Sequence, residues 1–337
     1  HEGKGFPLWT PYFYSGQPYM AIPEYYLFDL NFLLIWLTNN IYVSMNIAVI
    51  FYFFLAGLGM YLLVDLILKN RHAAFIAALI YLFNDFMQSF ILSGHLNMLE
   101  SFAYMPFIFL FVHKAIHDEQ YWVYAVLAAT FASLMILAGG IIFFLYTFLL
   151  IGLYLAFSFI FSKEYGKDLL RYAIIGALLL VVTFAFAAIK LLPSIEFVNI
   201  SSRAATVSFE EFLGEPISVT NVLGTFLLTK KLGFSVAIGV LGFLLLIVGM
   251  LSFRKKIILF SFLVIVLAIL IGMGSFLAQW MYHLPGFKQM RHVERALVLF
   301  AFVAPIVCAQ GFMTVSNFIK EKISLIRKEQ IIAGTVI

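Results

Sequence analysis

Long apolar stretches separated by short polar breaks dominate the pattern along the chain. No charged residue occurs between Tyr121 and Phe161, and a stretch of this length is enough for two membrane spans of about 20 residues each. Tight breaks such as Gly139-Gly140 are typical of connections between antiparallel neighbours. The pattern predicts about nine membrane-spanning helices, near residues 43–67, 73–92, 97–116, 121–138, 141–161, 169–189, 232–252, 257–276 and 296–316.

Two features interrupt this pattern. The stretch from Leu27 to Leu37 is apolar but too short to span, so we expect it to lie in the membrane interface or to re-enter. Asp85 lies within an apolar span, where a charge is costly. Either Asp85 lines a wet cavity at a break in the span or is paired inside the bundle, or the helix ends near Phe83.

Composition excludes an ordinary soluble domain. Apolar residues make up 64% of the 337 residues and charged residues 11%, and the mean hydropathy is +1.02. A soluble domain needs roughly a quarter of its residues charged. The runs do not alternate in polarity as membrane strands do, so the predicted fold class is an all-α, polytopic transmembrane helix bundle. The single cysteine, Cys308, allows no disulfide within the chain.

The positions of Lys and Arg orient this bundle. Basic residues occur in every second connection, whereas the short turns at 93–96 and 139–140 carry none. The positive-inside rule therefore predicts a multi-pass protein of the cytoplasmic membrane with an extracytoplasmic N-terminal segment. The expected parts are that segment with an interfacial helix (1–42), six spans (43–189), an extracytoplasmic loop (190–231), and three further spans with the start of another (232–337).

Three stretches of the chain carry a family resemblance. They are Phe6 to Pro18 (FPLWTPYFYSGQP), Ser93-Gly94-His95-Leu96 followed by Met105-Pro106, and Leu284-Pro285-Gly286-Phe287 followed by Arg291, Arg295 and Gly311. Leu192-Pro193 with Glu196 and Arg203 fits the same order. In order and spacing, these stretches resemble the YfhO-type bacterial membrane proteins of the C-type (GT-C) glycosyltransferase superfamily.

The resemblance implies an activity, and it also implies that the catalytic carboxylate lies outside this chain. The activity is transfer of a sugar from a polyprenyl-phosphate donor to a glycan, lipid or protein acceptor of the cell envelope, on the extracytoplasmic face. The chain departs from the family pattern at Asp29, where a proline is usual. The family's first span and its acidic loop would precede His1, so we expect this chain to be an internal part of a longer protein. The expected catalytic carboxylate then lies upstream.

Such a transferase needs a carboxylate or imidazole to deprotonate the acceptor hydroxyl. The catalytic candidates are His95, Glu100, Glu24 and Asp29. His95 lies in a predicted outside turn, and Glu24 and Asp29 are the N-terminal carboxylates nearest the membrane. Glu100 also fits a first helical turn, where the helix dipole favours a carboxylate without any function. The sequence shows no classical metal-ligand spacing. Whether the reaction uses a divalent cation is left open, and other cofactors are unknown.

The site also needs cations that hold the phosphate leaving group, for which Arg is well suited. The binding candidates are Arg291, Arg295, Arg203, Trp9 and Tyr12. Arg291 and Arg295 are four residues apart and would share one helix face. The alternative is that they snorkel to lipid head groups. The exposed aromatics can stack on sugar rings or belong to an interfacial belt.

Two other classes of function stay open. One is a transporter or flippase of lipid-linked saccharides, which broken helices and midplane charges such as Asp85 would favour. The other is a non-catalytic membrane assembly protein. The chain has no basic patch interleaved with aromatics, so we expect no nucleic-acid partner. Membrane lipids are the expected surroundings.

Overall fold

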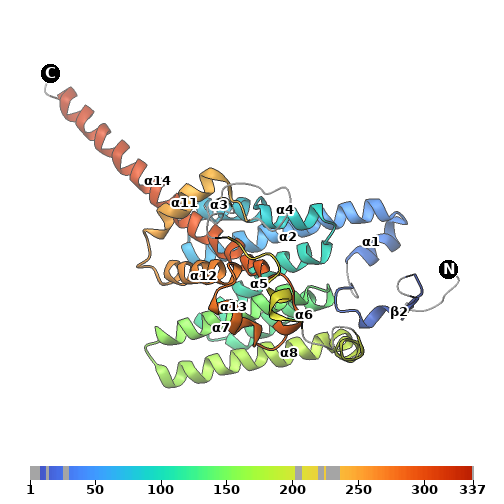
Figure 1. Cartoon of the computed structure of the whole chain (residues 1–337). Helices are drawn as coiled ribbons and strands as arrows, with labels where there is room; N and C mark the ends of the chain where they lie inside the picture. The colour runs from blue at the N-terminus through green and yellow to red at the C-terminus, as the bar shows by residue number, and fades with distance from the viewer. Residues whose placement is uncertain are drawn as a thin grey trace.

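Helices make up nearly all of the described structure. The computed structural model describes residues 8–12, 15–25, 30–201, 207–218, 224 and 236–335. The N-terminal region holds strands β1 (Trp9–Thr10) and β2 (Gln17–Pro18), the 3-10 turn η1 (Tyr19–Ala21) and helix α1 (Leu30–Thr38). The helices that follow are α2 (Ile41–Leu68), α3 (Arg71–Leu82), α4 (Asp85–Leu92), α5 (Leu96–His117), α6 (Tyr121–Leu137), α7 (Ile141–Ile160), α8 (Tyr165–Ile200), α9 (Phe209–Leu213), α11 (Gly239–Met250), α12 (Lys256–Gly272), α13 (Phe276–Tyr282), η3 (Phe287–Gln289), η4 (Val293–Ala296) and α14 (Leu297–Thr335). This arrangement confirms the prediction of an all-α polytopic bundle (Figure 1).

The number of full-length spans is smaller than predicted. Among the described residues, six helices are long and apolar enough to cross a membrane, or seven if the bent pair α12 and α13 counts as one span. The other two predicted spans correspond to shorter apolar helices, α6 and α11. At 1.5 Å per residue, the 17 residues of α6 reach roughly 26 Å and the 12 residues of α11 roughly 18 Å. Both are shorter than a hydrocarbon core of about 30 Å.

Asparagines begin three of the first helices. The side chains of Asn40, Asn70 and Asn84 accept backbone N–H groups at the starts of α2, α3 and α4. Asn84 also decides the question about Asp85, because α3 ends at Leu82 and Asp85 is the first residue of α4. The helix break near Phe83, one of the three open alternatives, is the observed one.

The turns gather at two ends of the bundle. The turns at 93–95 and 138–140 lie with the N-terminal segment at one end, which we call the loop end (Figure 1). The turns at 69–70, 161–164 and 251–255 lie at the other end, which we call the basic end. Helix α7 therefore begins at the loop end and finishes at the basic end.

Helices α5 and α14 form the centre of the bundle. The most apolar windows of the α5 span and of the span that includes α14 are 83% and 89% buried, against 22% for α8. Small residues let helices approach, as is usual where lipid provides no hydrophobic drive between helices. A Cβ atom added at Gly311 of α14 would lie 2.0 Å from the Leu245 carbonyl oxygen of α11. The outer half of α14 extends away from the bundle (Figure 1).

Candidate functional site

The N-terminal segment presents aromatic side chains on a small hairpin. Trp9 pairs with Pro18 in the β1–β2 ladder, and a Cβ atom at Gly16 would lie 2.6 Å from the Trp9 ring. Gly16 has a φ of +104°, which a residue with a Cβ rarely adopts. The ring therefore covers the turn while keeping 58% of its surface exposed, and Tyr12 keeps 71%. Both predicted aromatic candidates are accessible to a ligand.

A buried lysine holds this segment on the bundle. Lys190 is only 1% exposed, and its ammonium group donates hydrogen bonds to the carbonyls of Ile22 (2.6 Å) and Tyr25 (2.7 Å). A buried ammonium is tolerated where its protons are bonded in this way. Helix α8 accordingly runs through Lys190 to Ile200, beyond the predicted end of the span at 189. Lys190, the first residue of the predicted extracytoplasmic loop 190–231, is thus helical and buried against the N-terminal segment.

The turn between α6 and α7 joins the segment to helix α5. A Cβ atom at Gly139 would lie 2.6 Å from the Glu24 carbonyl oxygen, so the segment rests directly on this turn. Below it, the Asn97 amide donates to the Gly139 carbonyl at 3.4 Å. The hydroxyl of Ser101 fills the space that a side chain at Gly140 would need. The candidate Glu24, which is exposed, therefore lies at the start of α7.

Two catalytic candidates lie on or beside α5, in different environments. Glu100 is 1% exposed and is the fifth residue of α5, so the expected first-turn position, where the dipole acts most strongly, was wrong. It lies on the same helical stretch as Asn97 and Ser101. His95 precedes α5, makes no side-chain capping bond and is exposed, with its ring 6.2 Å from that of Phe90. The structure therefore gives the buried position to the carboxylate and the solvent-facing one to the imidazole.

Arg291 and Arg295 do not share a helix face. His292 between them has a φ of +71°, which breaks the backbone direction, and only Val293–Ala296 forms a 3-10 turn. The predicted four-residue helical spacing was therefore wrong. Arg291 is exposed and lies 3.8 Å from the Glu211 carboxylate, whereas Arg295 is half-buried.

Arg295 lies in η4, directly before α14. Its charge and that of Glu294 both reach the buried Tyr146 hydroxyl of α7. Glu294 is in turn held by His292, whose ring nitrogen lies 2.9 Å from the carboxylate. The Tyr146 ring also packs edge-on against Phe287 at 5.5 Å. Phe287 and the Gly139 turn thus both lie at the first two turns of α7.

The segment 207–214 packs against the residues that precede α14. Val207 donates its N–H to the Lys288 carbonyl (3.1 Å) and accepts the Tyr282 hydroxyl (2.7 Å). A Cβ atom at Gly214 would lie 2.9 Å from the His292 ring. The candidates Asp29 and Arg203 lie outside the described residues. Within the described ranges, no group of three or more His, Cys, Asp or Glu residues is placed to hold a metal ion.

These features define a multi-pass membrane protein whose polar candidates gather at one end of a helix bundle. A family model matches residues 19–336, under the description "6-pyruvoyl-tetrahydropterin synthase related domain; membrane protein". The chain belongs to this membrane-protein family. Comparison with curated proteins and with solved structures gave no match. The family description supports a membrane protein in general and does not single out the YfhO type.

Proposed function

We propose that the protein is a membrane glycosyltransferase that takes a sugar from a polyprenyl-phosphate donor at the loop end of the bundle. The observation that carries the proposal is Arg295, a half-buried cation in η4 whose charge reaches the buried Tyr146 hydroxyl of α7. A lipid-linked phosphate at membrane depth needs such a partner, because an ion is costly there unless it is paired. The exposed Arg291 lies nearby in the chain and offers a second cation.

Carboxylates and aromatics at the same end support transfer chemistry. Glu24 is exposed beside the Gly139 turn, and Trp9 and Tyr12 present open ring faces on the same segment. Sugar rings stack on such faces, and a carboxylate can act as a general base. Lys190 fixes this segment, so its aromatics are positioned in advance of binding.

The proposed step is a single displacement. A carboxylate such as Glu24, or one supplied from outside this chain, removes the proton of the acceptor hydroxyl. The acceptor oxygen then bonds to the anomeric carbon while the bond from that carbon to the phosphate oxygen breaks. The electron pair stays on the polyprenyl phosphate, and Arg295 stabilises that charge as it develops. In this scheme the carboxylate keeps the proton until solvent takes it.

The test is a transfer assay with the full-length protein in lipid nanodiscs. Radiolabelled polyprenyl-phosphate sugars are supplied, and label is followed into a cell-envelope extract. We expect Arg295→Gln to lower the transfer rate roughly 10- to 100-fold, since a hydrogen bond to a charged group contributes about 1.5–3 kcal/mol. The matched control is Arg254→Gln, an exposed arginine at the basic end. Equal rates for the two variants would exclude Arg295 from the site.

A second candidate, a flippase of lipid-linked saccharides, is favoured by broken helices. Helices α12 and α13 are bent by 85° at Gly274, which has a φ of +72°, and α3 and α4 break at Asn84. Transporters use such interrupted helices at their substrate sites. Movement of a labelled lipid-linked saccharide across proteoliposomes without any acceptor would support this function. If neither transfer nor movement is detected, the non-catalytic assembly protein is the remaining function.

A further inference from the structure

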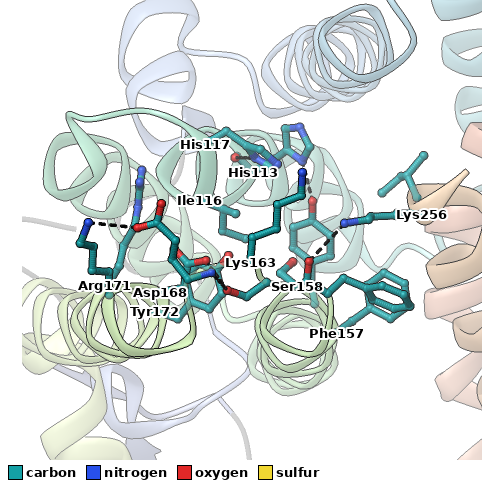
Figure 2. A pocket seen from close by; sticks show the side chains of 16 residues that line it. His113, Ile116, His117, Phe157, Ser158, Lys163, Asp168, Arg171, Tyr172 and Lys256 are labelled. Carbon is teal, nitrogen blue, oxygen red and sulfur yellow. Dashed lines mark hydrogen bonds and ion pairs between the residues drawn. The ribbon is translucent and has the colours of Figure 1, made fainter.

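The basic end of the bundle contains a polar pocket that the proposed transferase does not use. It has a volume of about 660 Å³ and lies where α5 and α7 finish and where α8 and α12 begin (Figure 2). This volume lies in the range of pockets that hold small ligands, roughly 300–1,000 Å³. Its lining includes the four cationic residues Lys163, Lys167, Arg171 and Lys256 and the two carboxylates Glu164 and Asp168.

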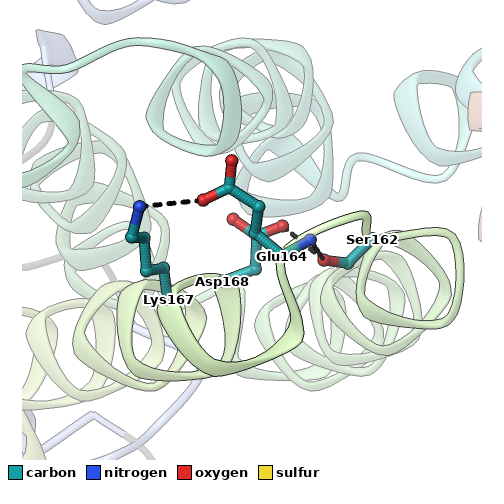
Figure 3. A network of polar contacts seen from close by, with 4 residues as sticks. All are labelled: Ser162, Glu164, Lys167 and Asp168. Atoms are coloured by element: carbon teal, nitrogen blue, oxygen red, sulfur yellow. Dashed lines mark hydrogen bonds and ion pairs between the residues drawn. The ribbon is translucent and has the colours of Figure 1, made fainter.

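Both carboxylates in the lining already have partners. Lys167 lies 3.0 Å from Glu164, and the Ser162 hydroxyl donates to Asp168 (Figure 3). The same Ser162 oxygen accepts the Glu164 backbone N–H at 3.1 Å. The Glu164 charge is therefore paired with Lys167, and Asp168 is held by a hydrogen bond within the turn between α7 and α8.

The C-terminal carbonyl groups of α5 and α7, the two helices that end at the pocket, also have hydrogen-bond partners. Arg171 donates to the carbonyls of Ala115 (2.8 Å) and Asp118 at the end of α5. Lys256 donates to the Phe161 carbonyl at the end of α7 (3.2 Å). The negative helix ends at the pocket are thus compensated by protein cations.

The N-terminal ends of α8 and α12, together with Lys163, leave positive charge at the pocket for a ligand. The N-cap residues of α8 and α12, Glu164 and Lys255, make no side-chain capping bond, so neither of these side chains blocks the positive helix ends at the pocket. Lys163 makes no hydrogen bond or ion pair with any residue that the structure describes. Its side chain extends across the pocket toward His113 (Figure 2).

The surroundings favour a lipid as the source of the anion. Exposed apolar side chains flank the pocket along α7 and α8, among them Ile160, Phe161 and Leu169. Phosphate head groups lie at the ends of membrane helices, and basic pockets between such helices bind anionic lipids. We infer that this pocket binds the phosphate of an anionic phospholipid, with Lys163 as the cation that meets it and the acyl chains along α7 and α8.

The experiment compares lipid binding by the purified full chain in detergent micelles. Phosphatidylglycerol and phosphatidylcholine are titrated separately, and bound lipid is counted by native mass spectrometry. We expect a preference for phosphatidylglycerol that falls about fivefold in Lys163→Gln, from roughly 1 kcal/mol for one basic residue near an anionic lipid. Ser158→Phe, which places a ring in the pocket, should also lower it, while Arg254→Gln should not.

Two results would overturn the inference. One is an unchanged preference in both Lys163→Gln and Ser158→Phe at an unchanged thermal midpoint. The other is displacement of the lipid by an equal concentration of inorganic phosphate, which would make free phosphate the ligand instead. Resistance to phosphate supports the lipid. Because Lys163 lies at the opposite end from Arg295, a failed transfer assay would leave this result unaffected.

Discussion

Replacing Lys190 by methionine tests how the N-terminal segment is held. The variant removes two charge-assisted hydrogen bonds, to the carbonyls of Ile22 (2.6 Å) and Tyr25 (2.7 Å). Each such bond contributes about 1.5–3 kcal/mol, so attachment of the segment should weaken by roughly 3 kcal/mol or more. That corresponds to an opening equilibrium about 100-fold more favourable.

The stability of the whole bundle should change much less. A buried ammonium carries a desolvation cost of several kcal/mol, and methionine removes that cost along with the bonds. The assay is hydrogen exchange of the peptide that contains the Tyr25 amide, which donates to the Ile22 carbonyl at 3.2 Å. Faster exchange there, with unchanged exchange in α5, is the expected result.

The matched control lies on the same helix. Thr183→Val removes the 3.3 Å bond from the Thr183 hydroxyl to the Ala129 carbonyl and touches no described part of the segment. It should leave exchange of the segment unchanged. If Lys190→Met exchanges at the wild-type rate around Tyr25, the lysine does not hold the segment and the reasoning fails.

Two glycine substitutions test the close approaches. Gly139→Ala places a Cβ atom 2.6 Å from the Glu24 carbonyl oxygen at a φ of +79°, and the backbone strain alone costs about 1–2 kcal/mol. Hydrogen exchange of the N-terminal segment should therefore become faster, and the thermal midpoint should fall. Exchange at the wild-type rate would count against the contact. Gly311→Ala forces α14 away from the Leu245 carbonyl and should lower the midpoint, whereas Gly176→Ala, with nothing within 4 Å of its Cβ, should not. Equal midpoints for the last two variants would contradict the packing.

The helical class was predictable because it follows from local properties. An apolar run of about 20 residues must satisfy its backbone internally in lipid, and a helix does this whatever its neighbours are. The break at Asn84 also had a local signal, an asparagine directly before an aspartate within an apolar run. Span lengths were less predictable, since the polar contacts that let α8 continue past Lys190 come from a segment more than 160 residues earlier.

Among the candidate site residues, Glu24 and His95 lie at the loop end, whereas Arg295 lies in η4 before α14. The relation of Arg291 to Arg295 was wrong, because the left-handed backbone at His292 cannot be read from spacing. Lys190 was missed because a lysine near the end of an apolar run looks the same whether it faces head groups or buried carbonyls.

The sequence by itself determined that this chain is a membrane helix bundle with its basic turns at alternate connections, because both properties depend only on composition along the chain. Only the tertiary structure decided which polar groups are buried, such as Lys190 and Glu100, and which are open, such as His95. It also gathered Lys163 and the starts of α8 and α12 around one pocket. Burial and convergence depend on contacts between segments far apart in the chain, and no local pattern carries that information.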